Sequence, residues 1–146
     1  MGRYEARATV DWQGFGGTVE SASGMLATAT AAQVELGGPG GATNPEELFA
    51  AAHANCFTST ITSMARSRGI GLAHVLTEAQ VRLEWSDDAG DHRLAASDLS
   101  VRLTSSAAES DLRTLVDDAT EHCPVCQAIS GNVAMQVTAV FERPRP

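Results

Sequence analysis

The chain contains no lysine, and its ten basic side chains are arginines scattered from Arg3 to Arg145. With 18 acidic residues, they give a formal net charge of −8. Proteins that bind nucleic acids neutralise phosphates with clustered cations, and the sequence has no such cluster. We therefore expect no nucleic-acid partner.

Long apolar runs are also missing. No stretch reaches the roughly 18 apolar residues needed to span a bilayer, and the N-terminal residues do not resemble a secretory signal. This predicts a cytoplasmic protein without a membrane partner. A length of 146 residues with 43% hydrophobic content fits one domain over residues 1–146.

Cysteine is scarce, with three residues in the chain. An odd number at this low density is not typical of a disulfide-stabilised secreted domain, so we expect reduced thiols. Their presence favours redox or metal chemistry.

Hydrophobic periodicity predicts an α+β fold. Strands are expected at 4–12, 18–22, 26–36, 75–85, 99–103 and 133–141, with a turn at 87–90. Helices are expected at 45–68, 106–122 and 124–129. Three strands therefore precede the first helix, a hairpin follows it, and two helices lead to the last strand.

The first of these helices has well-marked ends. Asn44 is placed as N-cap, Pro45 as the first helical residue and Glu47 as the partner in a capping box, while Gly69 ends the helix. Its interior is rich in alanine, serine and threonine. Such small residues allow close approach of other backbone, which predicts a central, largely buried helix.

Two cysteines carry the strongest chemical signal. The thiolate is the reactive form, and only a few per cent of an unperturbed thiol is ionised near neutral pH. Cys123 precedes Pro124 and so lies at a helix N-terminus, where free N–H groups stabilise an anion. Cys56 lies mid-helix and needs another activator, for which His53 on the same face is the nearest candidate. The alternative is that Cys56 is a small packing residue.

Cys123-Pro124-Val125-Cys126 is a C-x-x-C sequence with several interpretations. A thioredoxin-type redox pair would follow an early strand, whereas this one comes late in the chain. A zinc site would need further ligands, for which the sequence offers Cys56 and four dispersed histidines, His53, His74, His92 and His122. Neither interpretation is settled by the spacing.

Two segments together resemble a known family. The run Thr43-Asn44-Pro45-Glu46-Glu47-Leu48-Phe49-Ala50-Ala51-Ala52-His53-Ala54-Asn55-Cys56-Phe57, with Cys123-Pro124-Val125-Cys126-Gln127 before a terminal strand, is similar to the OsmC/Ohr family of thiol-dependent peroxidases. Ala52-His53 resembles the OsmC branch.

The resemblance implies an α+β fold with two antiparallel sheets around a long central helix, in an intertwined homodimer. It implies a cofactor-free peroxidase in which Cys56 attacks an organic hydroperoxide and Cys123 resolves the sulfenic acid as a disulfide. A dithiol, such as a lipoyl group or a small thiol, would then reduce that disulfide. Glu46 matches a glutamate that orients a catalytic arginine. Ten residues of helix separate Glu46 from Cys56 by roughly 15 Å, so Glu46 is expected to serve the other subunit.

The sequence departs from the family pattern in its cations. The family arginine lies in the first glycine-rich loop or shortly before the Asn-Pro-Glu motif, yet no arginine occurs between Arg7 and Arg66. Arg7, Arg82, Arg102 or His53 could replace it, and Cys126 is an extra thiol that could compete for Cys123. One alternative is therefore an OsmC-like protein with weak or lost peroxidase activity that acts as a thiol sensor or small-molecule binder. The other alternative is a zinc-binding protein that uses Cys123 and Cys126.

Overall fold

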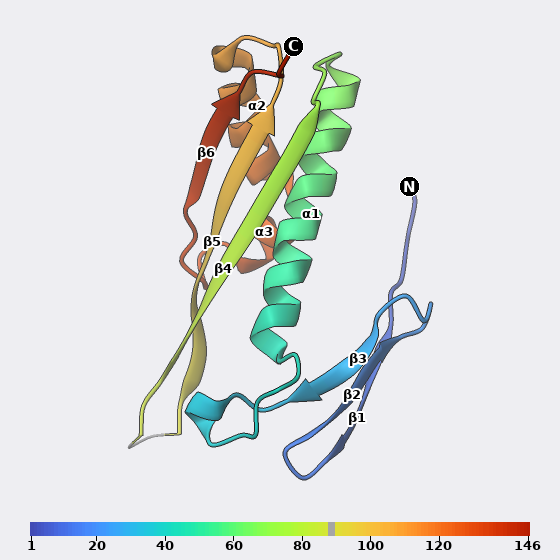
Figure 1. Ribbon diagram of the computed structural model, residues 1–146, viewed down its shortest axis with the longest axis vertical. Helices are drawn as coiled ribbons and strands as arrows, with labels where there is room; N and C mark the ends of the chain where they lie inside the picture. The colour runs from blue at the N-terminus through green and yellow to red at the C-terminus, as the bar shows by residue number, and fades with distance from the viewer. Residues whose placement is uncertain (88–89) are drawn as a thin grey trace. The chain divides into compact units, whose positions relative to one another are not determined.

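The computed structural model describes residues 1–87 and 90–146, which form two compact units, residues 1–48 and 49–146 (Figure 1). The predicted order of strands and helices is confirmed, with one additional 3-10 helix. The predicted turn at 87–90 includes two residues that lie outside the described part of the chain.

The first unit contains a three-stranded antiparallel sheet. Its strands are β1 (Ala8–Gln13), β2 (Gly16–Ser21) and β3 (Ala27–Ala31), in that order. The predicted strand at 26–36 is wrong in its second half, because 3-10 helix η1 (Val34–Leu36) forms there. Gly37 ends η1 with φ of 80°, a left-handed conformation that glycine adopts without strain.

Helix α1 (Pro45–Ser67) begins at the predicted residue and ends one residue before the predicted end. The Asn44 side chain accepts a hydrogen bond from the Glu47 N–H at 2.8 Å, as expected of an N-cap. The capping box is incomplete, because the Glu47 carboxylate instead accepts a hydrogen bond from Thr43 at 2.9 Å. At the other end, Gly69 has φ of +68°.

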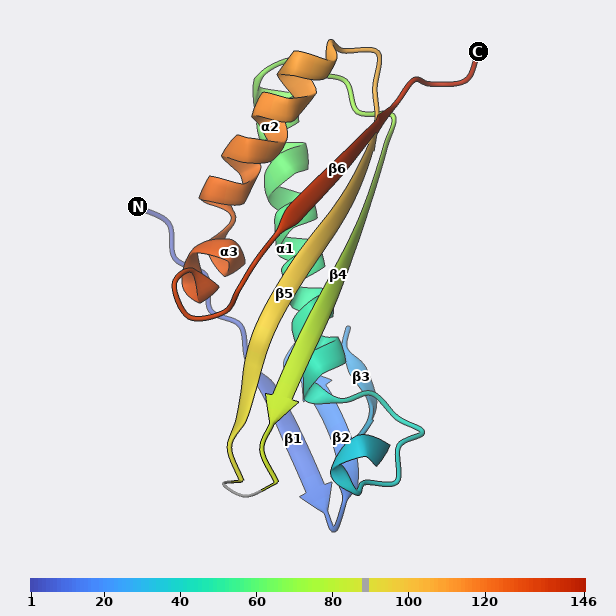
Figure 2. The same ribbon diagram turned by 90° about the vertical axis from the view of Figure 1, so that its left-hand side faces the viewer.

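The second unit is a sheet with helices on one face. The sheet has the order β4 (His74–Trp85), β5 (His92–Thr104), β6 (Val137–Glu142). Helices α2 (Glu109–His122) and α3 (Pro124–Ile129) connect β5 to β6, and they share one side of the sheet with α1 (Figure 2). The expectation of two antiparallel sheets needs correction here, because β6 runs parallel to β5. A helical crossover between two strands allows this parallel return.

The core of this unit lies between the sheet and its helices. A stripe on α1, Phe57, Ile61 and Ala65, packs with alternate residues of β5 and with the apolar face of α2. The opposite face of α1 is exposed in the single chain. The prediction of a largely buried helix is therefore wrong for the single chain, since the sheet and α2 cover only one side. Among the described residues, no helix has the length and apolar character required to cross a membrane.

Candidate active site

Three thiols meet in the second unit. Cys56 comes from the middle of α1, Cys123 is the N-cap of α3, and Cys126 lies in the first turn of α3. All three are free cysteines. The Cys123 thiol raises the pKa of both other thiols, so it lies beside each of them in the middle of the cluster. The fold thus brings together the two motifs that carry the family resemblance.

The thiols differ in exposure. Cys56 is half-buried, whereas Cys123 and Cys126 are 0% and 2% exposed. Cys56 lines a shallow groove of about 470 Å³ with Ser59, Thr60, Ser63, Met64, His122 and Pro124. A small molecule in solution can therefore contact the Cys56 thiol directly. The thiols of Cys123 and Cys126 are closed to solvent, so they can react only with a neighbouring group such as an oxidised Cys56.

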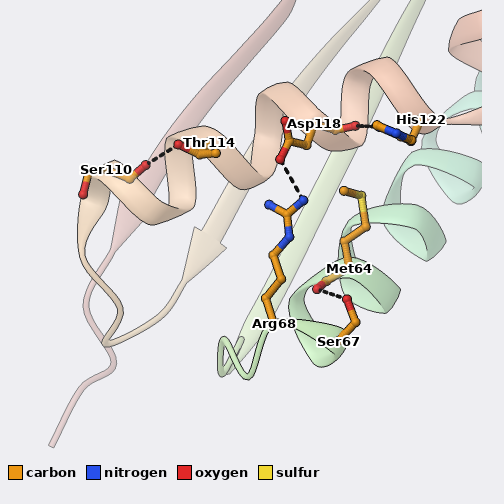
Figure 3. Close-up of polar contacts among 7 residues, drawn as sticks. All are labelled: Met64, Ser67, Arg68, Ser110, Thr114, Asp118 and His122. Atoms are coloured by element: carbon orange, nitrogen blue, oxygen red, sulfur yellow. Dashed lines mark hydrogen bonds and ion pairs between the residues drawn. The ribbon is translucent and has the colours of Figure 1, made fainter.

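The groove is bounded by α1 and the end of α2. Arg68 and Asp118 form an ion pair at 2.7 Å that joins these helices, and Met64 lies nearby (Figure 3). The His122 Nδ1 hydrogen-bonds the Asp118 carbonyl at 2.8 Å, which fixes the imidazole at the rim of the groove. The Arg68 guanidinium is engaged by Asp118 in this arrangement.

The Cys56 thiolate is stabilised by a backbone group that the sequence did not indicate. Burial raises the pKa of its thiol, and the backbone N–H of Val125 opposes this by hydrogen-bonding the sulfur. Contact with Cys123 raises the pKa further. Because Pro124 has no N–H, Val125 supplies the first free N–H of α3. The Cys123 thiol makes no capping hydrogen bond, so the N-terminus of α3 serves Cys56 rather than Cys123.

His53 faces the third thiol. Its ring is completely buried, with Nδ1 2.6 Å from Ser97 Oγ and Nε2 3.3 Å from Cys126 Sγ. Burial lowers the pKa of His53, which favours the neutral imidazole. Both ring nitrogens are therefore occupied by Ser97 and Cys126, and the expected role of His53 as activator of Cys56 receives no support from these contacts.

Ser97 is a site residue that the sequence analysis missed. It lies on β5 in phase with Leu99, Val101 and Leu103, so it belongs to the buried face of that strand. A polar residue on an otherwise apolar face requires a partner, because an unsatisfied buried hydroxyl is costly. A serine among the apolar residues of this strand face was the sequence signal that could have identified Ser97.

Glu46 belongs to the first unit and has a neutral partner there. The Gln33 amide donates a hydrogen bond to the Glu46 carboxylate. Gln33 begins the segment before the Asn-Pro-Glu motif in which the resemblance places an arginine. Over residues 1–87 and 90–146, Glu46 forms no ion pair, so an amide stands where a guanidinium was expected.

The arginines considered as replacements are engaged on the sheet of the second unit or lie in the first unit. Arg82 pairs with Glu84 at 3.3 Å, and Arg102 pairs with Glu142 at 3.4 Å. Arg7 lies in the first unit. In the part of the chain that the structure describes, no three histidine, cysteine or acidic side chains are arranged to hold a metal ion.

Comparison with known proteins gives a consistent result. Residues 38–138 match the family model described as OsmC-like protein. The organic hydroperoxide resistance protein-like 2 of Staphylococcus epidermidis is 32% identical over 122 residues, covering 83% of this chain and 84% of that protein.

Solved structures agree with the fold. The organic hydroperoxide resistance protein OsmC of Legionella pneumophila is 34% identical, with a TM-score of 0.78 over 95% of this chain and 98% of its own. An organic hydroperoxide resistance protein from Elizabethkingia anophelis is 26% identical, with a TM-score of 0.80 over 98% and 99%. The matched region and the shared fold show that this chain belongs to the OsmC-like family.

Proposed function

We propose that the protein is a cofactor-free, cysteine-based peroxidase that reduces organic hydroperoxides. One observation carries the proposal: the accessible thiol, Cys56, lies in a groove and contacts a buried thiol, Cys123. A peroxidatic thiol must meet its substrate, and a resolving thiol must meet the oxidised sulfur. The names of the relatives support the same substrate class.

The reaction follows from these two thiols. The Cys56 thiolate attacks one peroxide oxygen, the O–O bond breaks, and the alkoxide leaves as an alcohol after protonation. Cys56 becomes a sulfenic acid. The Cys123 thiol then attacks that sulfur, water leaves, and a Cys56–Cys123 disulfide forms. A dithiol, such as a lipoyl group or a small thiol, reduces this disulfide and becomes a cyclic disulfide.

A homodimer is part of the proposal. Strand β1 is exposed along its whole length and leaves apolar side chains on the surface of the single chain, Val10 and Trp12 among them, and one face of α1 is exposed as well. Exposed apolar surface of this kind is typical of a protein–protein interface. We infer that a second copy of the chain covers it.

Hydroperoxide consumption tests the proposed function. With dithiothreitol present, the purified protein should remove many equivalents of cumene hydroperoxide, and remove it faster than hydrogen peroxide. The groove that contains Cys56 offers Met64 and Pro124 to an alkyl group, which hydrogen peroxide lacks. A rate equal to that of a protein-free sample would refute the peroxidase.

A second candidate function has its own support. The raised pKa of Cys56 and the neutral partner of Glu46 both disfavour fast catalysis. They favour an OsmC-like protein with weak peroxidase activity that senses thiol oxidation or binds a small molecule.

Restoring the cation separates these candidates. We expect Gln33→Arg to raise the rate of cumene hydroperoxide consumption roughly tenfold, because the family resemblance places a catalytic arginine in this segment, and such a guanidinium stabilises a thiolate and polarises the peroxide. The comparison uses initial rates at pH 7. Gln80→Arg, which adds the same charge at an exposed position of β4, is the matched control and should leave the rate unchanged. Equal rates for Gln33→Arg and the unmodified protein would exclude a missing arginine as the cause of a low rate.

A further inference from the structure

The proposed peroxidase cycle leaves one buried thiol unused. Cys126 is 2% exposed and contacts Cys123 on one side and His53 on the other. Its sulfur lies 3.3 Å from His53 Nε2, and the other nitrogen of that ring lies 2.6 Å from Ser97 Oγ. The C-x-x-C sequence at 123–126 therefore has a base, His53, next to its second thiol, Cys126.

We propose that a thiol–disulfide exchange replaces Cys56 by Cys126 as the partner of Cys123. The final oxidised form of the protein then contains a Cys123–Cys126 disulfide and a free Cys56 thiol. This inference rests on the proposed function for the origin of the first disulfide. The Cys126 thiol gives its proton to His53 Nε2 while its sulfur attacks the Cys123 sulfur. The Cys56–Cys123 bond breaks, and Cys56 leaves as a thiolate. The exchange consumes no oxidant or reductant, because one disulfide replaces another.

The positions of the two cysteines permit the new bond. Cys123 is the N-cap of α3 and Cys126 is three residues later, in the first turn. Residues at this spacing on a helix have Cβ atoms about 5–6 Å apart, and a disulfide needs Cβ atoms about 3.5–4.5 Å apart. The new bond therefore requires the two Cβ atoms to move closer, and we place that movement at Cys123, which lies at the helix boundary with extended backbone, φ −65° and ψ 119°.

The chemistry of the thiols sets the direction of exchange. Burial and contact with Cys123 raise the pKa of Cys126 to about 12. Burial also raises the pKa of Cys56, but the Val125 N–H stabilises its thiolate. The thiol that forms the more stable thiolate is the better leaving group, so exchange should release Cys56 and retain Cys126 in the disulfide.

His53 is suited to receive the proton. Burial lowers the pKa of His53, which keeps the ring neutral but weakens it as a base, so its position identifies it as the acceptor: Nε2 lies 3.3 Å from the Cys126 sulfur. A thiol is a weak donor and a weaker acceptor, so we infer that the Cys126 S–H points to Nε2 and that Nδ1–H donates to Ser97. Ser97 is then a positioning residue that holds the imidazole in this tautomer.

Trypsin distinguishes the two disulfides directly. The chain has no lysine, and cleavage after Arg7, Arg66 and Arg113 places Cys56 in peptide 8–66 and both other cysteines in peptide 114–146. A Cys56–Cys123 disulfide therefore links two peptides, whereas a Cys123–Cys126 disulfide lies within one peptide. The protein is oxidised with one equivalent of cumene hydroperoxide, quenched in acid, alkylated with N-ethylmaleimide and analysed by mass spectrometry over time.

The expected result is a linked pair of peptides that disappears with time. Peptide 8–66 should reappear with alkylated Cys56, and peptide 114–146 should carry no alkyl group and be two mass units lighter. In Cys126→Ser the linked pair should persist. A linked pair that persists equally in the unmodified protein would overturn the inference.

The role of Ser97 is tested by the rates of the two steps. Ser97→Ala should slow the loss of the linked pair roughly tenfold without slowing its formation. Ser105→Ala is the matched control, because Ser105 is also a buried serine with a 2.6 Å hydrogen bond, to the Gly71 carbonyl. Equal slowing in both variants would remove Ser97 from the mechanism.

Diamide separates a failure of this inference from a failure of the proposed function. It oxidises thiols to disulfides without peroxide chemistry, so it can replace the hydroperoxide in the same peptide analysis. If cumene hydroperoxide leaves the thiols reduced while diamide yields the Cys123–Cys126 disulfide through the linked pair, the peroxidase is refuted and the exchange stands. If diamide gives only the persistent linked pair, the exchange is refuted.

Discussion

Replacing Cys56 with serine should lower the rate of cumene hydroperoxide consumption more than ~100-fold, to that of protein-free buffer. A serine hydroxyl is not ionised in the pH range where the protein is assayed. The two remaining thiols are at most 2% exposed, so neither can meet a substrate in the groove. Initial rates with saturating dithiothreitol measure the effect.

Thr62→Ala provides the control for this substitution. Thr62 lies on the exposed side of the same helix and bonds only to backbone carbonyls of α1, at 2.7 and 3.1 Å. It should retain the full rate. If Cys56→Ser folds as the unmodified protein does, by circular dichroism, and keeps a tenth or more of the rate, the peroxidatic role belongs to another group.

Local signals in the sequence were sufficient for much of the fold. The ends of α1 could be predicted because Asn44, Pro45 and Gly69 act within one turn of the helix. The direction of β6 could not, because alternation of apolar and polar residues is the same in parallel and antiparallel strands. The exposure of one face of α1 could not be predicted either. Small residues indicate that other backbone packs closely against a helix, but they do not indicate whether that backbone belongs to the same chain or to another.

The family resemblance predicted that the two cysteine motifs lie close together. It did not predict which groups raise or lower the pKa of the thiols. Spacing on a helix placed His53 beside Cys56, whereas the ring in fact bonds to Ser97 and Cys126. The donor to Cys56 is a backbone group, the N–H of Val125, and only the proline before it hinted at an open helix end. Backbone donors from another element leave no side-chain signature in a sequence.

The reactivity of Cys56 should rise about tenfold per pH unit from pH 6 to pH 8. Burial raises the pKa of this thiol more than the Val125 N–H lowers it, and Cys123 adds to the increase. The thiolate is the reactive form, so reactivity is lost as pH falls and gained as pH rises towards the pKa. Iodoacetamide alkylation of Cys56, followed in peptide 8–66, measures the thiolate without requiring peroxidase activity.

A plateau below pH 7 would contradict this profile and would require a cation beside Cys56. The same titration on Gln33→Arg shows what that cation contributes. If the introduced guanidinium stabilises the thiolate, the profile should move to lower pH, whereas Gln80→Arg should leave it in place because that residue lies on the exposed side of β4. A shift of the pH profile together with a faster peroxidase would show that an arginine at position 33, where the family resemblance expects one and Gln33 now bonds to Glu46, is what Cys56 lacks.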